Sequence, residues 1–182
     1  MIIQVVAGGY AMGERLTPVE FNGIRNHLER ISDTWADLWF LLNLTQVNIT
    51  QLLRCRYQDL QGNMLVLPEP GTFAEKYIAL PPTARIIIGQ RRSRYPGDIF
   101  LFQSHSLRVK ATDRPVTLIA FNTALKKAAQ GVTPKMVSSK SALYIPSASA
   151  LLAGASIASA PATTSGAVGS LNDQNDVPER YR

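Results

Sequence analysis

Side chains that could carry out covalent or metal chemistry are few in this sequence. Its 182 residues hold one cysteine, Cys55, and two histidines, too few for a disulfide framework or a Cys/His zinc site. We therefore expect no metal and no cofactor. Only Arg54 and Arg56 stand beside Cys55 to activate its thiol, so we predict that Cys55 packs in the core. His105 is predicted to be an exposed loop residue without a catalytic role.

Lysine and arginine, in contrast, are concentrated in one stretch of the chain. Between Lys76 and Lys140 there are twelve of them against two acids, Asp98 and Asp113, which gives this stretch a charge of +10. The whole chain carries +6, so the remainder stands at −4. A basic band of this kind is typical of a protein that contacts a polyanion, although solvated surfaces also gather cations. The distribution favours nucleic acid as the partner.

Two helices are expected in the first quarter of the chain. Thr17 is a good N-cap, Pro18 suits the first helical position and Glu20 stands in capping-box register, which predicts a helix to about residue 30. Its buried positions would be Phe21, Ile24 and Leu28. A second helix begins at residues 32–33 and is apolar on most faces, so we expect it to be central, with Trp35 and Trp39 packed in the core.

The rest of the domain combines a small sheet with shorter helices. Residues 45–50 interrupt the helical pattern and 50–55 resume it. Residues 57–60, 64–67 and 76–80 read as strands joined by turns at 61–63 and 69–71, which makes an antiparallel sheet. Helices are then expected at 83–89, before the basic run 91–94, and between 117 and 130, with a short apolar segment at 99–102. In the last helix, Lys126 and Lys127 face outward and four residues face inward: Ile119, Ala120, Leu125 and Ala128.

These elements predict a mainly α fold with a small antiparallel β-sheet, an α+β class. We divide the chain into a lead at 1–15, a domain at 16–172 and a polar C-terminal tail at 173–182. Residues 141–172 are rich in Ala and Ser and uncharged, and this composition favours a flexible tail. The longest apolar run, 35–44, is about half of the roughly 20 residues that a membrane span needs, and the N-terminus lacks a basic targeting region. We expect a soluble protein of the reducing cytoplasm that does not interact with membranes.

The order of these elements, with particular residues, resembles the catalytic domain of the tyrosine recombinase (phage integrase) family. Residues 16–21 are similar to its L-T-x-x-E opening. Residues 45–60 match, without a gap, its T-G-x-R-x-x-E-L-x-x-L-x-W-x-D-I box. Residues 78–81, 99–102 and 114–117 resemble its I-P-L, L-F and P-[IV]-[ST] segments. The resemblance covers the chain from residue 16 to the C-terminus and implies the fold of that domain.

The chemistry of this family, as the resemblance implies it, uses a tyrosine that attacks a DNA phosphate. Two arginines, a lysine and His-type groups stabilise the transition state. In this sequence those four positions, in the order first arginine, lysine, histidine and second arginine, hold Asn48, Gly71, Lys140 and Leu143. A neutral amide cannot supply the cationic fork of an arginine. Tyr181 falls at the nucleophile position, and Lys76 is a nearby substitute for the lysine, but without the arginines we expect no cleavage or joining of DNA strands.

The register that places Lys140 and Leu143 also makes residues 141–172 a buried Ala-rich helix, so a helix and a flexible tail both stay open for this segment. The segment, with the tail after it, is also a candidate for homo-oligomer contacts.

We therefore expect a protein that binds double-stranded DNA without cutting it, an accessory factor or transcriptional regulator of a mobile element or plasmid. The candidate DNA contacts are Arg54, Arg56, Lys76, Arg91, Arg92, Arg94, Lys126, Lys127, Lys135 and Lys140. Arg54 and Arg56 have Asp59 as an alternative partner. Two other functions stay open. One is a working recombinase with shifted catalytic residues, and the other is a protein-interaction module that meets an acidic partner.

Overall fold

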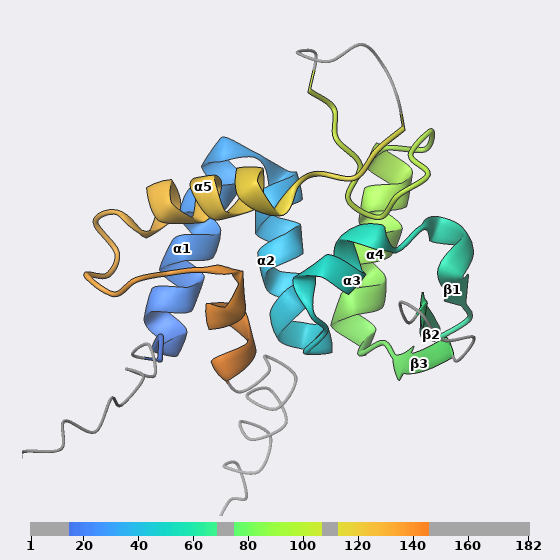
Figure 1. Cartoon of the computed structure of the whole chain (residues 1–182), viewed down its shortest axis with the longest axis horizontal. Coiled ribbons are helices and arrows are strands. Elements are labelled where there is room, and N and C mark those ends of the chain that lie inside the picture. The colour runs from blue at the N-terminus through green and yellow to red at the C-terminus, as the bar shows by residue number, and fades with distance from the viewer. Residues whose placement is uncertain (1–14, 69–74, 107–112, 146–182) are drawn as a thin grey trace, which may run out of the picture.

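The computed structural model describes residues 15–68, 75–106 and 113–145 (Figure 1). The elements in chain order are α1 (Pro18–Ile31), α2 (Asp33–Thr45), α3 (Ile49–Arg54), the 3-10 helix η1 (Tyr57–Asp59), β1 (Leu60–Gln61), β2 (Met64–Pro68), β3 (Glu75–Ala79), α4 (Pro82–Arg94), α5 (Leu118–Ala129) and the 3-10 helix η2 (Ser139–Tyr144). The predicted mainly α fold with a small antiparallel sheet is confirmed. Gly71 and Tyr181 lie outside the described residues, as do the predicted lead 1–15 except for residue 15, the part of the predicted segment 141–172 after residue 145, and the predicted tail 173–182.

The start of α1 is built as predicted. The Thr17 hydroxyl accepts the amide of Glu20 at 3.2 Å, and the Glu20 carboxylate accepts the amide of Thr17 at 2.7 Å. This reciprocal capping box fixes the first turn of the helix. The three predicted core positions, Phe21, Ile24 and Leu28, are all buried.

Helix α2 is the central helix of the structure. Helices α1 and α4 and the 3-10 helix η2 pack against it, and α5 packs against α1 (Figure 1). Trp39 is fully buried, stacks on Phe21 with 5.0 Å between ring centroids, and donates its indole N–H to the Phe21 carbonyl at 3.2 Å. Trp35 packs on the ring of Phe121 in α5. The prediction of a central buried helix is confirmed, with Trp39 in the core, whereas Trp35 is partly buried and packs against that core.

The sheet has the strand order β1-β2-β3, antiparallel throughout. Leu65 faces Leu60 on one side and Ile78 on the other, and Leu65 and Leu67 are fully buried. The strand predicted over 57–60 was wrong for its first three residues, which form η1. Asp59 explains the difference, because its carboxylate accepts the amide of Arg56 at 2.7 Å and closes a turn at this point.

Helix α4 is longer than predicted, because the basic run 91–94 belongs to it. Its buried face consists of Ala84, Ile87, Ile88 and Arg91, the spacing of one helical stripe. An arginine therefore occupies a position where the helical pattern calls for an apolar side chain. For this reason the sequence pattern did not predict the last turn of α4.

Helix α5 presents a different face to the core from the one predicted. Leu125 and Ala128 are buried and Lys126 and Lys127 are exposed, as predicted. Ile119 and Ala120, however, are exposed, because the buried stripe starts at Phe121 and continues through Ala124. No helix among the described residues is both long enough and apolar enough to cross a membrane.

Candidate functional site

The loop between α2 and α3 holds the first position that the family resemblance singled out. Gln46 ends α2 in the left-handed conformation, with a φ of 55°. Asn48 then caps α3, because its side-chain oxygen accepts the amide and the hydroxyl of Thr50 at 2.9 and 2.8 Å. The Asn48 carboxamide is thus bound to its own helix, which is the structural role that asparagine commonly takes at an N-cap.

A buried asparagine joins this end of α2 to η2. Asn43 lies in the last turn of α2, and its Nδ2 donates to the carbonyls of Ala142 at 2.9 Å and Ile145 at 3.2 Å. The 3-10 helix η2 carries Lys140, which is exposed, and Leu143, which is partly buried. The structure therefore brings Asn48, Lys140 and Leu143 to the same end of α2. Sequence reasoning missed Asn43, and the one signal for it was a polar residue within an otherwise apolar stretch.

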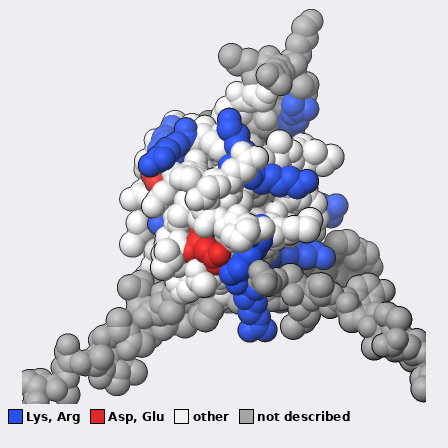
Figure 2. Space-filling model, turned by 90° about the vertical axis from the view of Figure 1, so that its left-hand side faces the viewer, with Lys and Arg blue, Asp and Glu red and all other residues white. Residues whose placement is uncertain are grey.

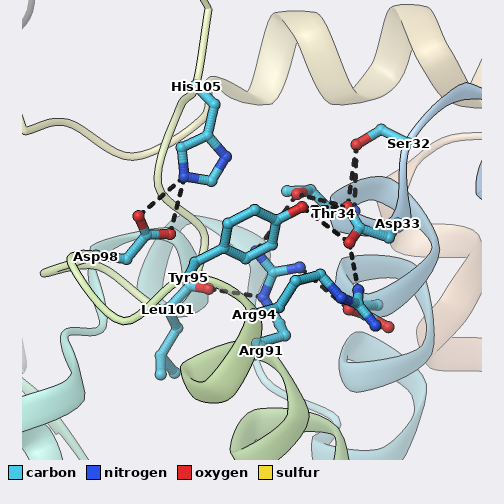
Figure 3. A network of polar contacts seen from close by, with 10 residues as sticks. Ser32, Asp33, Thr34, Arg91, Arg94, Tyr95, Asp98, Leu101 and His105 are labelled. Atoms are coloured by element: carbon cyan, nitrogen blue, oxygen red, sulfur yellow. Dashed lines mark hydrogen bonds and ion pairs between the residues drawn. The ribbon is translucent and has the colours of Figure 1, made fainter.

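The opposite end of α2 is tied to α4 by an arginine network (Figure 3). The Arg91 guanidinium binds Asp37 at 3.1 Å, the Thr34 hydroxyl at 3.3 Å and the Leu101 carbonyl at 3.0 Å. Arg94 forms an ion pair with Asp33, whose carboxylate also accepts the Tyr95 hydroxyl at 2.9 Å.

Burial and hydrogen bonds act in opposite directions on the two aspartates. Burial raises the pKa of Asp33, but hydrogen bonds from Tyr95 and Arg94 outweigh it and the net shift is downward. For Asp37 burial dominates, and the hydrogen bond from Arg91 only partly offsets the rise in pKa.

This network corrects the prediction for Arg91 as a DNA contact. Its side chain is 1% exposed, so it cannot reach a phosphate outside the protein. Arg94 is exposed but is paired with Asp33. Helix α2 has 13 residues, and at 1.5 Å per residue its two ends lie about 20 Å apart. Arg94 therefore lies far from Asn48, at the other end of the helix.

His105 and Cys55 differ in their surroundings. The His105 side chain is 41% exposed, as predicted, but it also stacks on Tyr95 and its Nε2 lies 2.9 Å from the Asp98 carboxylate (Figure 3). Cys55 is buried, and burial raises the pKa of its thiol to about 12, so it stays protonated at neutral pH. The packing prediction for Cys55 is confirmed.

The remaining predicted DNA contacts divide into cations that bind internal partners and cations that form no internal ion pair. Lys135 is held by the Glu20 carboxylate at 2.8 Å and by the Arg15 carbonyl at 2.9 Å. Asp59 forms no ion pair with Arg54 or Arg56 in the part of the chain that the structure describes. The exposed members of the set that form no ion pair within 15–68, 75–106 and 113–145 are Arg54, Arg56, Lys76, Arg92, Lys126, Lys127 and Lys140.

One face of the molecule displays cations over α1 and α5. Figure 2 views the side that lies to the left in Figure 1, and lysine and arginine side chains are spread across it with only small groups of acidic side chains among them. Lys126 and Lys127, in the last turn of α5, lie on the exposed surface of that helix.

Comparison with known proteins found matches at the level of structure. No family model and no curated protein matches the chain by sequence. The structure is similar to a lambda integrase fragment dimer bound to a COC' core site, with a TM-score of 0.60 and 13% identity over 72% of this chain and 50% of that one. It is similar to XerA recombinase, with a TM-score of 0.58 and 12% identity over 77% of this chain and 51% of that one. It is also similar to the lambda integrase catalytic core, with a TM-score of 0.56 and 14% identity over 71% of this chain and 79% of that one.

This chain spans about half the length of the lambda integrase fragment and of XerA recombinase. Its mainly helical architecture with a three-stranded antiparallel sheet matches the fold of an integrase catalytic core.

Proposed function

We propose that this chain binds double-stranded DNA through an integrase-like fold and does not cut it, acting as an accessory factor or transcriptional regulator of a mobile element or plasmid. The observation that carries the proposal is the state of Asn48. At the position where the family resemblance calls for a cationic arginine, this chain has a neutral carboxamide that is occupied in capping α3.

A second position at this end of α2 supports the same proposal. Leu143 stands where the resemblance calls for the second arginine, and a leucine offers neither charge nor a hydrogen bond. Donors aimed at developing charge are usually the largest catalytic contribution, and removing one commonly costs about 3 kcal/mol, a factor of about 100 or more in rate. Loss of both arginines therefore leaves the integrase-like fold without its main stabilisation of the transition state.

Binding is supported by the cations that no internal ion pair uses. Seven exposed lysines and arginines of the predicted set are of this kind in the described part of the chain. Structural neighbours include lambda integrase bound to a COC' core site and XerH recombinase bound to its difH substrate. A surface of unpaired cations on this fold fits a polyanionic duplex.

The absence of chemistry is tested by a strand-cleavage assay. Supercoiled plasmid incubated with the full chain should yield no nicked product and no covalent 3'-phosphotyrosyl adduct. The resemblance assigns the nucleophile to the Tyr181 hydroxyl. The Y181F variant lacks this hydroxyl and should give the same result. An adduct that forms with the wild type and disappears in Y181F would show an active recombinase and overturn this part of the proposal.

DNA binding is tested by fluorescence anisotropy with a labelled duplex at several salt concentrations. The affinity should fall steeply with salt, because each phosphate contact contributes about one unit to the slope of log K against log salt. The double variant K126Q/K127Q should reduce that slope by about one unit for each phosphate that the two lysines neutralise in the wild type.

R85Q is the single-charge control for this titration. Arg85 is exposed on α4, lies outside the predicted set and donates to the Asn63 side-chain oxygen at 2.6 Å, so R85Q should leave the slope unchanged. Binding that does not change between about 50 and 300 mM salt would contradict a phosphate interface. Tight binding to an acidic protein or peptide without duplex binding would favour the protein-interaction module instead.

A further inference from the structure

We propose that Arg56 and Arg92 form a preorganised binding site for a phosphate group. The two residues are far apart in sequence, but both line one surface pocket of about 240 Å³, together with Tyr57, Gln58 and Asp98. This volume is many times what a single water needs, so the pocket has room for a phosphate and its hydration.

Aromatic rings hold both guanidinium groups in place. The Arg92 Cζ lies 4.6 Å from the centroid of the Tyr57 ring, and its Nη1 donates to the Asp98 carbonyl at 2.7 Å. The Arg56 Cζ lies 5.1 Å from the centroid of the Phe100 ring. Stacking of this kind fixes the plane of a guanidinium while leaving its N–H groups free to bind a ligand.

The two walls of the pocket are joined by backbone hydrogen bonds. Arg56 and Phe100 form an antiparallel bridge, the Tyr57 amide donates to the Ile99 carbonyl at 3.0 Å, and the Leu101 amide donates to the Cys55 carbonyl at 3.0 Å. These bonds fix the rings on which the arginines stack. The site is therefore largely formed before any ligand binds, which reduces the entropy lost on binding.

The charge of the pocket favours an anion. No carboxylate forms an ion pair with Arg56 or Arg92 within the described residues. Asp98 lines the pocket, but its side chain is only 7% exposed and both of its oxygens contact His105 Nε2, at 2.9 and 3.1 Å. The nearby Asp59 carboxylate accepts the backbone amide of Arg56. Two planar arginine forks match the oxygens of a phosphate better than those of a smaller anion.

This pocket is separate from the end of α2 described above. Asn48 directly precedes the first residue of α3, Ile49, whereas Arg56 lies two residues beyond its last residue, Arg54. The phosphate could belong to a DNA backbone or to a free phosphate compound, since both present the same oxygens. The DNA source rests on the proposed function, and the phosphate site itself does not.

The first experiment follows the side-chain Nε–Hε signals of the arginines by NMR while inorganic phosphate replaces chloride at constant ionic strength. We expect saturable shifts of the Arg56 and Arg92 signals. R56Q should abolish the shift of Arg92, and R30Q, which removes the same charge elsewhere, should leave both shifts intact. Because Arg92 also holds the Asp98 carbonyl, R92K is the second variant. It keeps the charge but loses the fork, and should weaken phosphate binding about three- to tenfold.

The second experiment repeats the duplex salt titration with R56Q. If the phosphate belongs to DNA, R56Q lowers the log–log salt slope by about one unit and R85Q, a change of the same charge on α4, does not. Phosphate shifts with an unchanged slope would support the site and refute the DNA source. Phosphate shifts in a chain that binds no duplex would overturn the proposed function while the site stands. Absence of specific shifts at Arg56 and Arg92 would overturn the phosphate site, whatever the duplex affinity.

Discussion

At the scale of single residues, Glu20 joins the start of α1 to a distant part of the chain. Besides its part in the capping box, its carboxylate accepts the Thr133 hydroxyl at 2.6 Å and binds the Lys135 ammonium at 2.8 Å. The hydrogen bond from Lys135, and after it the one from Thr133, lowers the pKa of Glu20 from 4.5 to about 2. Lys135 therefore stabilises the fold through Glu20, and its charge is largely neutralised within the protein.

This lowered pKa predicts a loss of stability in acid. A carboxyl whose pKa is lower in the folded state contributes stability above its unfolded pKa, and that contribution is lost as the pH falls toward the folded pKa. The contribution of Glu20 should therefore disappear between about pH 4.5 and pH 2. Urea unfolding measured across this range should show a flatter decline for E20Q than for wild type. E29Q, an exposed change on the same helix, should follow the wild-type curve, and a wild-type decline in E20Q would refute this role.

At the scale of elements, Arg91 holds α2 and α4 together. We predict that R91A destabilises the protein by roughly 3 to 5 kcal/mol, because it leaves Asp37 and the Leu101 carbonyl without their partner inside the structure. The free energy of unfolding in urea measures the loss. R30A, the same change at an exposed position, should alter it by less than about 0.5 kcal/mol. A small effect of R91A would mean that water replaces the guanidinium without cost.

The same residue shows what a sequence pattern can and cannot predict about elements. Local signals such as the Thr17 and Glu20 capping box were sufficient for α1, because every group involved lies within one turn of helix. The last turn of α4 and the burial of Arg91 were not predictable, since the partners of Arg91 come from α2 and from the segment near Leu101. The exposure of Ile119 follows equally from tertiary packing, which selects the stripe beginning at Phe121.

The candidate site also combines features that the sequence predicted with features that only the structure shows. The positions of Asn48, Lys140 and Leu143 followed from the family resemblance, and the structure places them at one end of α2. The link that brings them there, the side chain of Asn43 on the carbonyls of η2, joins residues about a hundred positions apart. The placement of Arg56 and Arg92 at one pocket also depends on contacts between distant segments. Neither this placement nor the Asn43 link could be derived from spacing along the chain.

At the scale of the whole molecule, the lysines and arginines between residues 76 and 140 fall into two groups. Arg91, Arg94 and Lys135 stabilise the fold through internal partners, whereas the exposed cations without ion pairs give the surface its charge. The charge of +10 between residues 76 and 140 therefore overstates the charge available to a partner. Counting charges along a sequence cannot separate these groups, because the separation depends on burial.

Binding of a duplex to the folded chain should also raise its stability. A ligand that binds only the folded state stabilises it by about 2.7 kcal/mol when present at 100 times its Kd. We expect the Tm of the protein to rise by several degrees with saturating duplex at low salt, and the increase to vanish as salt weakens binding. Thermal unfolding followed by circular dichroism measures both effects. An increase that is unaffected by salt would contradict a phosphate interface.

The cap formed by Asn48 sets what an arginine at this position would cost the fold. An arginine at this position would leave the Thr50 amide without its side-chain acceptor and would cost about 1 kcal/mol of stability at the start of a short helix. With leucine still at position 143, that change would bring no compensating activity. A change at position 143 leaves this cap intact, so under the proposed function it is the step at position 48 that stability disfavours.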